Sequence, residues 1–442
     1  MAIMTNRDAS PRLVSLDIFR GLTIAAMIVV NNPGSGREGA FFAPLRHAEW
    51  HGCTLADLVF PFFIFVVGVS AVFSLDKRRA GGALLAIYRH IFARALTIFF
   101  LGLATWFVCG WLFQALCPPV ATDQPFWSFF FAPPGDGDAY FFSLANLRIP
   151  GVLQRLALVY LVVALLVLHR GWRLQAAAAG ALLLAYWGLM TLTGFNLEAG
   201  QDLSSFIDRA IFGPGHLLKG DWDPEGLLST LPAIATGLFG ALTGHWLKSA
   251  RDGRQKLLGL WRAGGLSLAA GWLWGLTFPL NKSLWTSSYV LYSSGYALLT
   301  LGLVYWLIDL KRLKAPWTQP FLWLGTRPLL AYCLSQIGFL ALYHLYIGTP
   351  AAHTSLLTAI QQALFGENWD VLGLSNWQDP RWPSLFWALT CLTFWTLTVG
   401  LVQSRLSLFQ VFRKPAICRS PKPAALINVW DAKHLPAGYL GG

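Results

Sequence analysis

A polar and aromatic turn, His47-Ala48-Glu49-Trp50-His51-Gly52-Cys53-Thr54, leads directly into the apolar segment 55–68. Asp57 lies inside that segment, within the first turns of the membrane-length helix that it predicts. A charged side chain placed in hydrocarbon costs a few kcal/mol, and such residues are usually functional. We therefore expect the turn and Asp57 to form the reactive centre, with the rest of the chain holding it in place.

The composition of the 442-residue chain is too apolar for an ordinary soluble protein. Hydrophobic residues make up 55% of it, charged residues only 12%, and the mean hydropathy is +0.52. The 14% aromatic content fits belts at the two membrane interfaces and aromatic-lined cavities between helices equally well. The sequence therefore predicts a polytopic protein whose surroundings are a lipid bilayer.

A net charge of +12 raises nucleic acid as a partner, but the basic residues fall in short clusters between apolar spans. That placement is typical of membrane topology, so no nucleic-acid partner is expected. The six cysteines show no CxxC motif and no histidine at metal-ligand spacing, which predicts neither a zinc site nor a redox motif. Cys109 and Cys117 flank a predicted outer loop, where they either form a disulfide or remain free thiols.

Ten apolar segments are each near the length of about twenty residues that a helix needs to cross a bilayer. They are residues 16–31, 54–75, 84–111, 150–168, 174–193, 227–247, 263–280, 287–307, 320–346 and 384–404. The sequence Gly325-Thr326-Arg327-Pro328 interrupts one of them and favours a broken helix there. We therefore predict an all-α, polytopic membrane bundle of about ten transmembrane helices. Its single transmembrane domain covers residues 1–404, and residues 405–442 form a cytoplasmic tail.

The connections between the spans alternate in character. Basic residues cluster in 77–79, 169–173, 248–256, 311–314 and from 405 onward, whereas 117–148, 195–225 and 348–383 are rich in Pro, Gly and Asp. By the positive-inside rule the basic set is cytoplasmic, so both termini face the cytoplasm. The loop 32–53, which carries His47, then lies at the outer face, with Asp57 just below it.

Three local signals refine this picture. Asp17 and Arg20 lie three residues apart on one face of the first span, where we expect an ion pair in a helix that is retained rather than cleaved as a signal peptide. Residues 203–212 form a short amphipathic segment that rests on the interface or caps a pocket. Asp223-Pro224-Glu225-Gly226 combines an N-cap residue, a proline and an acidic first turn, which predicts a helix start.

His47 is the candidate catalytic group, because imidazole is the side chain that ordinarily titrates nearest neutrality. It would act as a general base or as a nucleophile that carries an acyl group, with Asp57 orienting its ring. The structural alternative is an interfacial histidine bonded only to a loop carbonyl. His51 follows within reach, but a zinc-protease motif needs Glu directly after the first histidine, and Ala48 stands there. We expect no metal, and a packing or hydrogen-bonding role for His51.

Other polar residues lie at the ends of spans or at membrane depth. Asn31 either donates to a developing oxyanion or caps its helix, and for Asn32 we favour the cap. Asn281-Lys282 lies at the outer end of a span.

Three arginines are candidates for binding a cofactor. Arg94 and Arg155 lie at membrane depth, where arginine pairs with an acid or binds an anion. Arg327 and the cluster 77–79 would meet the phosphates of a cofactor that enters from the cytoplasm, unless these charges only set the topology.

Several stretches of this chain resemble one family of enzymes. They are Arg12-Leu-Val-Ser-Leu-Asp-Ile-Phe-Arg-Gly21, His47-Ala-Glu-Trp-His-Gly-Cys-Thr-Leu-Ala-Asp-Leu-Val-Phe-Pro61, Gln154-Arg155-Leu156, Asp223-Pro-Glu-Gly226 and Pro279-Leu-Asn-Lys-Ser-Leu-Trp285. Each is weakly specific alone, but together and in this order they are similar to the heparan-α-glucosaminide N-acetyltransferase family and its bacterial NagX-like relatives.

The resemblance implies transfer of an acetyl group from cytoplasmic acetyl-CoA to the amino group of a glucosamine on the far side of the membrane. The family's active histidine falls on His47, its loop asparagine on Asn31 and its helix-two aspartate on Asp57. In the direct version His47 takes a proton as the amine attacks the thioester, and in the two-step version an acetyl-His47 forms first. We expect Arg94, Arg155 and Arg327 to bind acetyl-CoA.

The acceptor side of the site is less closely matched to the family. We expect the sugar to be contacted by four residues, Trp50, His51, Asn281 and Lys282. Compared with the animal enzymes, we expect no N-terminal luminal domain in this chain, and its loop between Asn31 and His47 looks longer. A free amino sugar or a cell-wall fragment is therefore the safer acceptor. The resemblance also implies a bacterial inner membrane, with the histidine loop at the periplasmic side. It further implies a homodimer.

A transporter for an amino sugar or a related small solute is the competing class of function, since about ten spans with buried charges also suit alternating access. Sugar uptake without any requirement for CoA would favour it.

Overall fold

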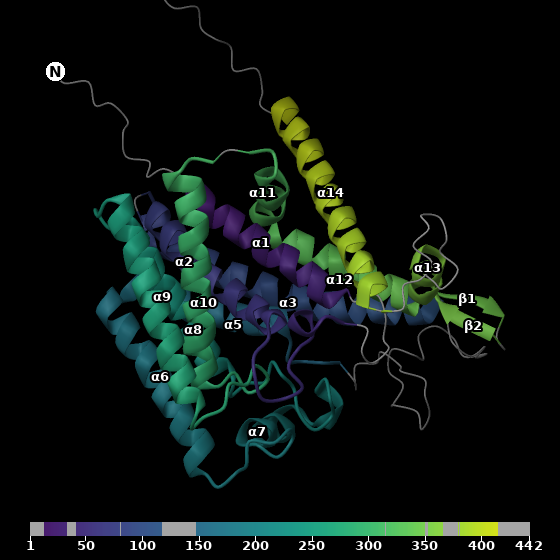
Figure 1. Cartoon of the computed structure of the whole chain (residues 1–442), viewed down its shortest axis with the longest axis horizontal. Helices are drawn as coiled ribbons and strands as arrows, with labels where there is room; N and C mark the ends of the chain where they lie inside the picture. Colours follow the sequence, from purple (N-terminus) through teal and green to yellow (C-terminus); the bar gives the residue numbers. More distant parts are fainter. Residues whose placement is uncertain are drawn as a thin grey trace, which may run out of the picture. The chain divides into compact units, whose positions relative to one another are not determined.

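A computed structural model describes residues 13–32, 41–79, 81–116, 147–313, 315–349, 352–365, 379 and 381–413. Residues Met1–Gly400 belong to one compact unit and Leu401–Gly442 to a second. The first unit is a helical bundle with one short antiparallel hairpin (Figure 1). Cys117 and the side chain of Cys109, whose pairing was left open above, lie outside the described residues.

The helices and strands follow one another in this order. They are α1 (Val14–Asn31), η1 (Ala43–Leu45), α2 (Leu55–Arg79), α3 (Leu84–Leu116), α5 (Val152–His169), α6 (Trp172–Leu192), α7 (Leu203–Phe212), η3 (Pro214–His216), α8 (Thr230–Lys248), α9 (Gly253–Gly275), α10 (Ser287–Tyr305), η4 (Trp306–Leu310), α11 (Thr318–Thr326), α12 (Pro328–His344), β1 (Tyr346–Thr349), β2 (Ala352–Ser355), α13 (Leu356–Phe365) and α14 (Arg381–Arg413). In the hairpin, Ile347 of β1 pairs with Thr354 of β2.

Seven of the described helices are long and apolar enough to cross a membrane. They are α1, α2, α3, α5, α6, α10 together with η4, and α14. The prediction of a helical protein with several membrane spans is confirmed to that extent. The other predicted spans correspond to α8, to α9 and to the pair α11 and α12, of which α12 is apolar but short.

Two predicted helix starts are wrong, and hydrogen bonds explain both. The helix predicted over 263–280 is α9, which begins well before, at Gly253, because the Asp252 side chain accepts a hydrogen bond from the Gln255 N–H at 2.8 Å and so caps it. Asp223 begins no helix, since α8 starts at Thr230. Its carboxylate instead accepts from the Glu225 N–H at 2.9 Å, the geometry of a turn, and pairs with Arg148.

Helix α2 packs against α1, α5, α8 and α10, and its contact with α8 is the closest (Figure 1). A side-chain carbon built on Gly68 of α2 would lie 1.9 Å from the carbonyl oxygen of Gly237, and one on Gly240 of α8 would lie 2.0 Å from that of Phe65. Backbone therefore touches backbone at both positions. This contact fixes α2, the helix that carries Asp57, in the bundle.

The predicted ion pair of the first span is present. Arg20 lies 3.1 Å from Asp17, and its guanidinium also donates to the Ser70 hydroxyl at 2.7 Å and to the Gly325 carbonyl at 2.8 Å. These bonds join α1 to α2 and to the end of α11. The helix predicted over 320–346 breaks at Arg327, between α11 and α12, as its Gly and Pro residues indicated.

Candidate functional site

The His47 ring meets the Asp57 carboxylate at the start of α2. Nδ1 of His47 lies 2.7 Å from Oδ1 of Asp57, a distance typical of a charge-assisted hydrogen bond. The Asp57 side chain is 1% exposed, whereas that of His47 is 46% exposed. One end of the imidazole is thus held by a buried carboxylate, while nearly half of the side chain is exposed.

The second oxygen of Asp57 is bonded by the backbone of the same turn. Oδ2 accepts from the Ala48 N–H at 3.1 Å and from the Thr54 N–H at 3.0 Å. Because Thr54 precedes the first residue of α2 and Asp57 is its third, the latter bond is one half of a capping box. The positive end of the helix dipole also favours an anion here. Asp57 therefore has a structural role besides any catalytic one, since it ties the His47 turn to the helix.

These bonds assign the tautomer of His47. An ionised carboxylate only accepts, so the proton of the ring lies on Nδ1 and the lone pair lies on Nε2. Nε2 is the nitrogen that can take a proton or attack a carbonyl carbon, as the sequence predicted for this residue. The catalytic role itself stays a prediction.

Lys282 reaches the pair from the turn before α10. Its Nζ lies 3.2 Å from Nδ1 and 3.4 Å from Nε2 of His47, and 3.8 Å from Oδ1 of Asp57. The side chain is 23% exposed. Burial lowers the pKa of Lys282, although the nearby charges of Asp57 and Glu225 act to raise it. Sequence analysis expected Lys282 at the acceptor site but could not place it against His47.

The turn that carries Lys282 is held rigidly. The Asn281 side chain accepts from the Leu284 N–H at 2.9 Å, and the Thr286 hydroxyl donates to the Pro279 carbonyl at 2.9 Å. Asn281 and Thr286 are fully buried. The Gly52 N–H donates to the Leu280 carbonyl at 2.7 Å, which joins this turn directly to the His47 turn.

Two further residues of the His47 turn contact distant parts of the chain. The side-chain nitrogen of Asn281 lies 3.4 Å from Nδ1 of His51, in line with the hydrogen-bonding role expected for this histidine. The Trp50 indole donates to the Leu197 carbonyl at 2.7 Å and lies edge-on to Trp222, with ring centroids 5.0 Å apart. Trp222 was missed by sequence analysis, because nothing in its local pattern points to Trp50.

Cys53 lies beside the pair without the properties of a nucleophile. Burial, with a smaller contribution from the charge of Asp57, raises the pKa of its thiol to about 12, against the opposing effect of Lys282. The thiolate is the reactive form of cysteine, so this residue stays an inert thiol near neutral pH.

The two asparagines at the end of α1 differ. Asn31 is its last residue and is exposed. Asn32 is buried, and its amide donates to the Ile28 carbonyl at 2.8 Å, which is the capping role favoured above. Asn31 thus remains the candidate for contact with a substrate.

The predicted cofactor-binding arginines lie on separate elements. Arg94 of α3 stacks on the Tyr160 ring at 4.9 Å, and Arg327 lies at the junction of α11 and α12. Arg155 of α5 is 1% exposed, lies 5.0 Å from the Trp285 ring and donates to the Gly226 carbonyl at 3.1 Å. Its Nε and Nη1 have no hydrogen-bond partner within the described part of the chain.

An ion-pair cluster that sequence analysis missed lies behind Trp222. Arg148 pairs with Asp223 at 2.7 Å and with Glu225 at 2.5 Å. Burial alone would lower the pKa of Arg148, but the two carboxylates raise it, so the guanidinium stays charged. The cluster explains why Asp223 starts a turn instead of a helix, and it holds the segment that carries Trp222.

Comparison with known proteins finds two relatives, from mouse and human, that carry the same name. The heparan-alpha-glucosaminide N-acetyltransferase of mouse (Mus musculus) is 28% identical over 393 residues, which cover 74% of this chain and 54% of the relative. That of Homo sapiens is 28% identical over 388 residues, which cover 73% of this chain and 52% of the relative. The chain thus spans about half the length of the curated relatives it matches. No family model matches it. The chain is a distant relative of the heparan-alpha-glucosaminide N-acetyltransferases.

Proposed function

We propose that this protein is a transmembrane N-acetyltransferase that moves an acetyl group from cytoplasmic acetyl-CoA to the amino group of a glucosamine-type sugar at the outer face of the membrane. One observation carries the proposal. His47 is bonded to the buried carboxylate of Asp57 while its own side chain is 46% exposed, and this pair stands at the end of a membrane-length helix. The distant relationship to named acetyltransferases supports the same reaction class.

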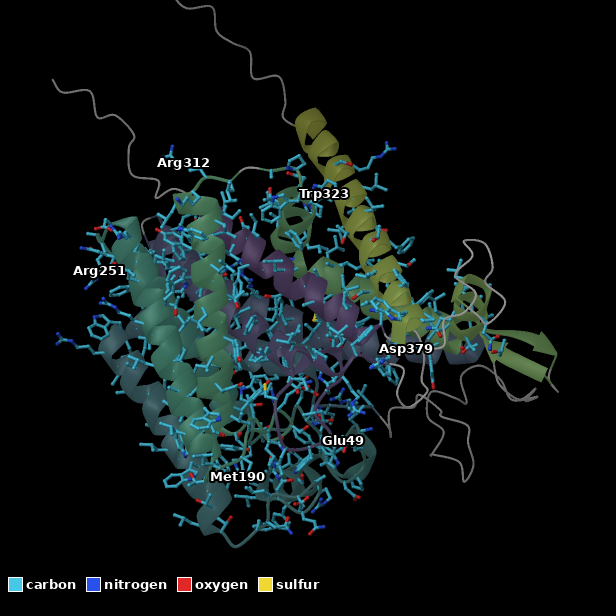
Figure 2. The ribbon with its side chains drawn as sticks, viewed as in Figure 1. Glu49, Met190, Arg251, Arg312, Trp323 and Asp379 are labelled. Atoms are coloured by element: carbon cyan, nitrogen blue, oxygen red, sulfur yellow. The ribbon has the colours of Figure 1, made fainter. Side chains whose placement is uncertain are left out.

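The two ends of the bundle differ in a way that supports this direction of transfer. Figure 2 shows Glu49, in the His47 turn, and Met190, near the end of α6, toward one end, while Arg251 and Arg312 of two basic connections lie toward the other. The positive-inside rule makes the basic end cytoplasmic. His47 would then work at the outer face, which is periplasmic in a bacterial inner membrane, and both termini would be cytoplasmic.

A cavity at the basic end fits the phosphates of the donor. It has a volume of about 440 Å³ and lies at the turn between α2 and α3. Its lining comprises Ser74, Lys77, Arg78, Gly81, Gly82, Ala86 and Ile87. Lys77 and Arg78 supply positive charge for phosphate groups. The unpartnered Nε and Nη1 of Arg155, deeper in the bundle, are suited to an oxygen of the pantetheine arm, and Arg94 and Arg327 remain further candidates for contact with the donor.

The site residues have distinct roles in the proposed transfer. Nε2 of His47 removes a proton from the sugar amine as its nitrogen attacks the thioester carbon, and Asp57 keeps the ring in the required tautomer. Asn31 donates to the oxyanion. Trp50 and His51 contact the sugar, together with the turn at Asn281.

The experiment is an acetyl-transfer assay on purified protein in proteoliposomes. Labelled acetyl-CoA and glucosamine should yield N-acetylglucosamine, and His47→Ala should abolish turnover. The matched control is His169→Ala, which removes an exposed histidine that bonds the Tyr88 hydroxyl at the other end of the bundle. Undiminished turnover in His47→Ala would refute the role of this residue. Uptake of sugar without any need for CoA would refute the enzyme assignment and favour a transporter.

A further inference from the structure

The proposed reaction includes two proton transfers, one from the amine nitrogen and one to the departing sulfur. When the carbon–sulfur bond of the thioester breaks, its electron pair stays on sulfur, and the CoA leaves as a thiolate unless an acid protonates it. At this stage Nε2 of His47 carries the proton that it took from the amine. In catalytic triads the imidazole passes this proton on to the leaving group itself, whereas a second group that carries a proton within reach of Nε2 would protonate the sulfur directly.

Lys282 is a neighbour of His47 that carries such a proton. Its Nζ lies 3.4 Å from Nε2, so it is adjacent to any carbon and sulfur that approach this nitrogen. Asp57 only accepts when ionised, and the buried thiol of Cys53 is a poor acid, because its pKa is raised to about 12. Hydrogen bonds of Asn281 and Thr286 hold the backbone of the turn from which the Lys282 side chain reaches His47.

We propose that Lys282 is a catalytic acid, which protonates the departing CoA sulfur and regains its proton through His47. This inference rests on the function proposed above. The amine nitrogen forms a bond to the thioester carbon, and the carbon–sulfur bond breaks. The amine proton passes to Nε2 of His47, and a proton of Lys282 passes to sulfur. The proton on Nε2 then moves to the neutral amine of Lys282 across their contact, so that both residues return to their initial states and no proton is gained or lost.

The surroundings of Lys282 suit this role. An ordinary lysine has a pKa of about 10.4 and an ordinary thiol about 8.5, so an exposed lysine is a weak acid toward a thiolate. Burial lowers the pKa of Lys282 and so narrows the difference between the pKa of this lysine and that of the CoA thiol. The charged and titratable groups that face it are Asp57, Glu225, Cys53 and His47, and the two carboxylates oppose the effect of burial by favouring the charged form.

The test compares two substitutions and two acetyl donors. Lys282→Arg keeps the positive charge but cannot release a proton, and Lys282→Gln removes both. With acetyl-CoA, kcat/KM should fall about 100-fold or more in both variants, the size expected for loss of a general acid. With S-4-nitrophenyl thioacetate, whose thiol leaves readily as an anion, both variants should stay within a few-fold of the wild type. That second result also shows that the variants are folded.

The dependence on pH gives an independent reading. The wild type should lose activity as the pH rises through the pKa of Lys282, because the acid must be protonated, and this loss should be absent from Lys282→Gln. Full activity of Lys282→Arg with acetyl-CoA, or an equal defect with both donors, would overturn the role of Lys282 while leaving the acetyltransferase in place. A wild type that transfers acetyl from neither donor would overturn the proposed function and this inference together.

Discussion

Replacing Asp57 by asparagine separates the orienting role of this residue from its packing. The amide keeps the size of the carboxylate, but one of its two terminal atoms becomes a nitrogen that only donates. If the amide oxygen keeps the bonds from the Ala48 and Thr54 N–H groups, the nitrogen faces Nδ1 of His47. The ring proton then moves to Nε2, and the lone pair that would act as base is lost. The opposite orientation leaves two buried N–H groups without an acceptor.

The structure sets the expected magnitudes of this change. The same exchange lowers kcat by about 10⁴-fold in catalytic triads, equivalent to about 5.5 kcal/mol of barrier, and we expect a loss of this order here. Asp57 accepts four hydrogen bonds, which come from the His47 ring, two backbone N–H groups and the Thr54 hydroxyl. Weakening each from a charged to a neutral acceptor costs about 1 kcal/mol, hence about 4 kcal/mol of stability in all.

The assay measures kcat for acetyl transfer from labelled acetyl-CoA and the thermal unfolding of the same preparation. Asp76→Asn is the matched control, because Asp76 lies at the opposite end of α2, where it pairs with Lys248. This control should keep its turnover. A kcat for Asp57→Asn within tenfold of the wild type, in protein that is still folded, would refute the reasoning about the tautomer.

Three other predictions concern the donor cavity, a buried carboxyl and the helix contact. Arg78→Ala should raise KM for acetyl-CoA about tenfold through loss of one charge-assisted contact, without changing KM for glucosamine, and Arg251→Ala should change neither. Burial raises the pKa of Asp208 in α7 to about 6, against an unfolded value near 4, so the folded state binds the proton more tightly and stability falls as the pH rises from about 4 to 6. Asp208→Asn should therefore unfold at a higher temperature than the wild type at pH 7.5, and this advantage should vanish below pH 4, as measured by thermal scans at both pH values. Gly240→Ala should lower the yield of folded protein, because the added carbon would lie 2.0 Å from the Phe65 carbonyl, whereas Gly180→Ala should not, since nothing lies within 4 Å of its added carbon.

Local patterns predicted much of the helical framework. The amphipathic segment 203–212 is α7, with Asp202 as its N-cap, and Asp17 pairs with Arg20 because both lie on one helix face. The contact between His47 and Asp57 could also be anticipated, since a short loop joins them.

Contacts between distant parts of the chain could not be predicted in the same way. Lys282 meets His47 only because the turn before α10 packs on the His47 turn, and no local pattern encodes that packing. Arg148 forms an ion pair with Asp223, and this long-range contact outweighs the local sequence pattern that predicted a helix start at Asp223. The bundle as a whole decides such pairings, so local patterns in one sequence do not reveal them.

The length of helix α2 sets the distance between the candidate site and the basic cavity. It runs unbroken from Leu55 to Arg79, with Asp57 near one end and two cavity residues, Lys77 and Arg78, near the other. At 1.5 Å per residue, a straight helix separates Asp57 from Lys77 by about 30 Å. A molecule anchored by its phosphates at the basic end must carry its reactive group on an arm of fixed length. The length of α2 would thus limit the donors that reach Asp57 from the basic end to those with a long enough arm.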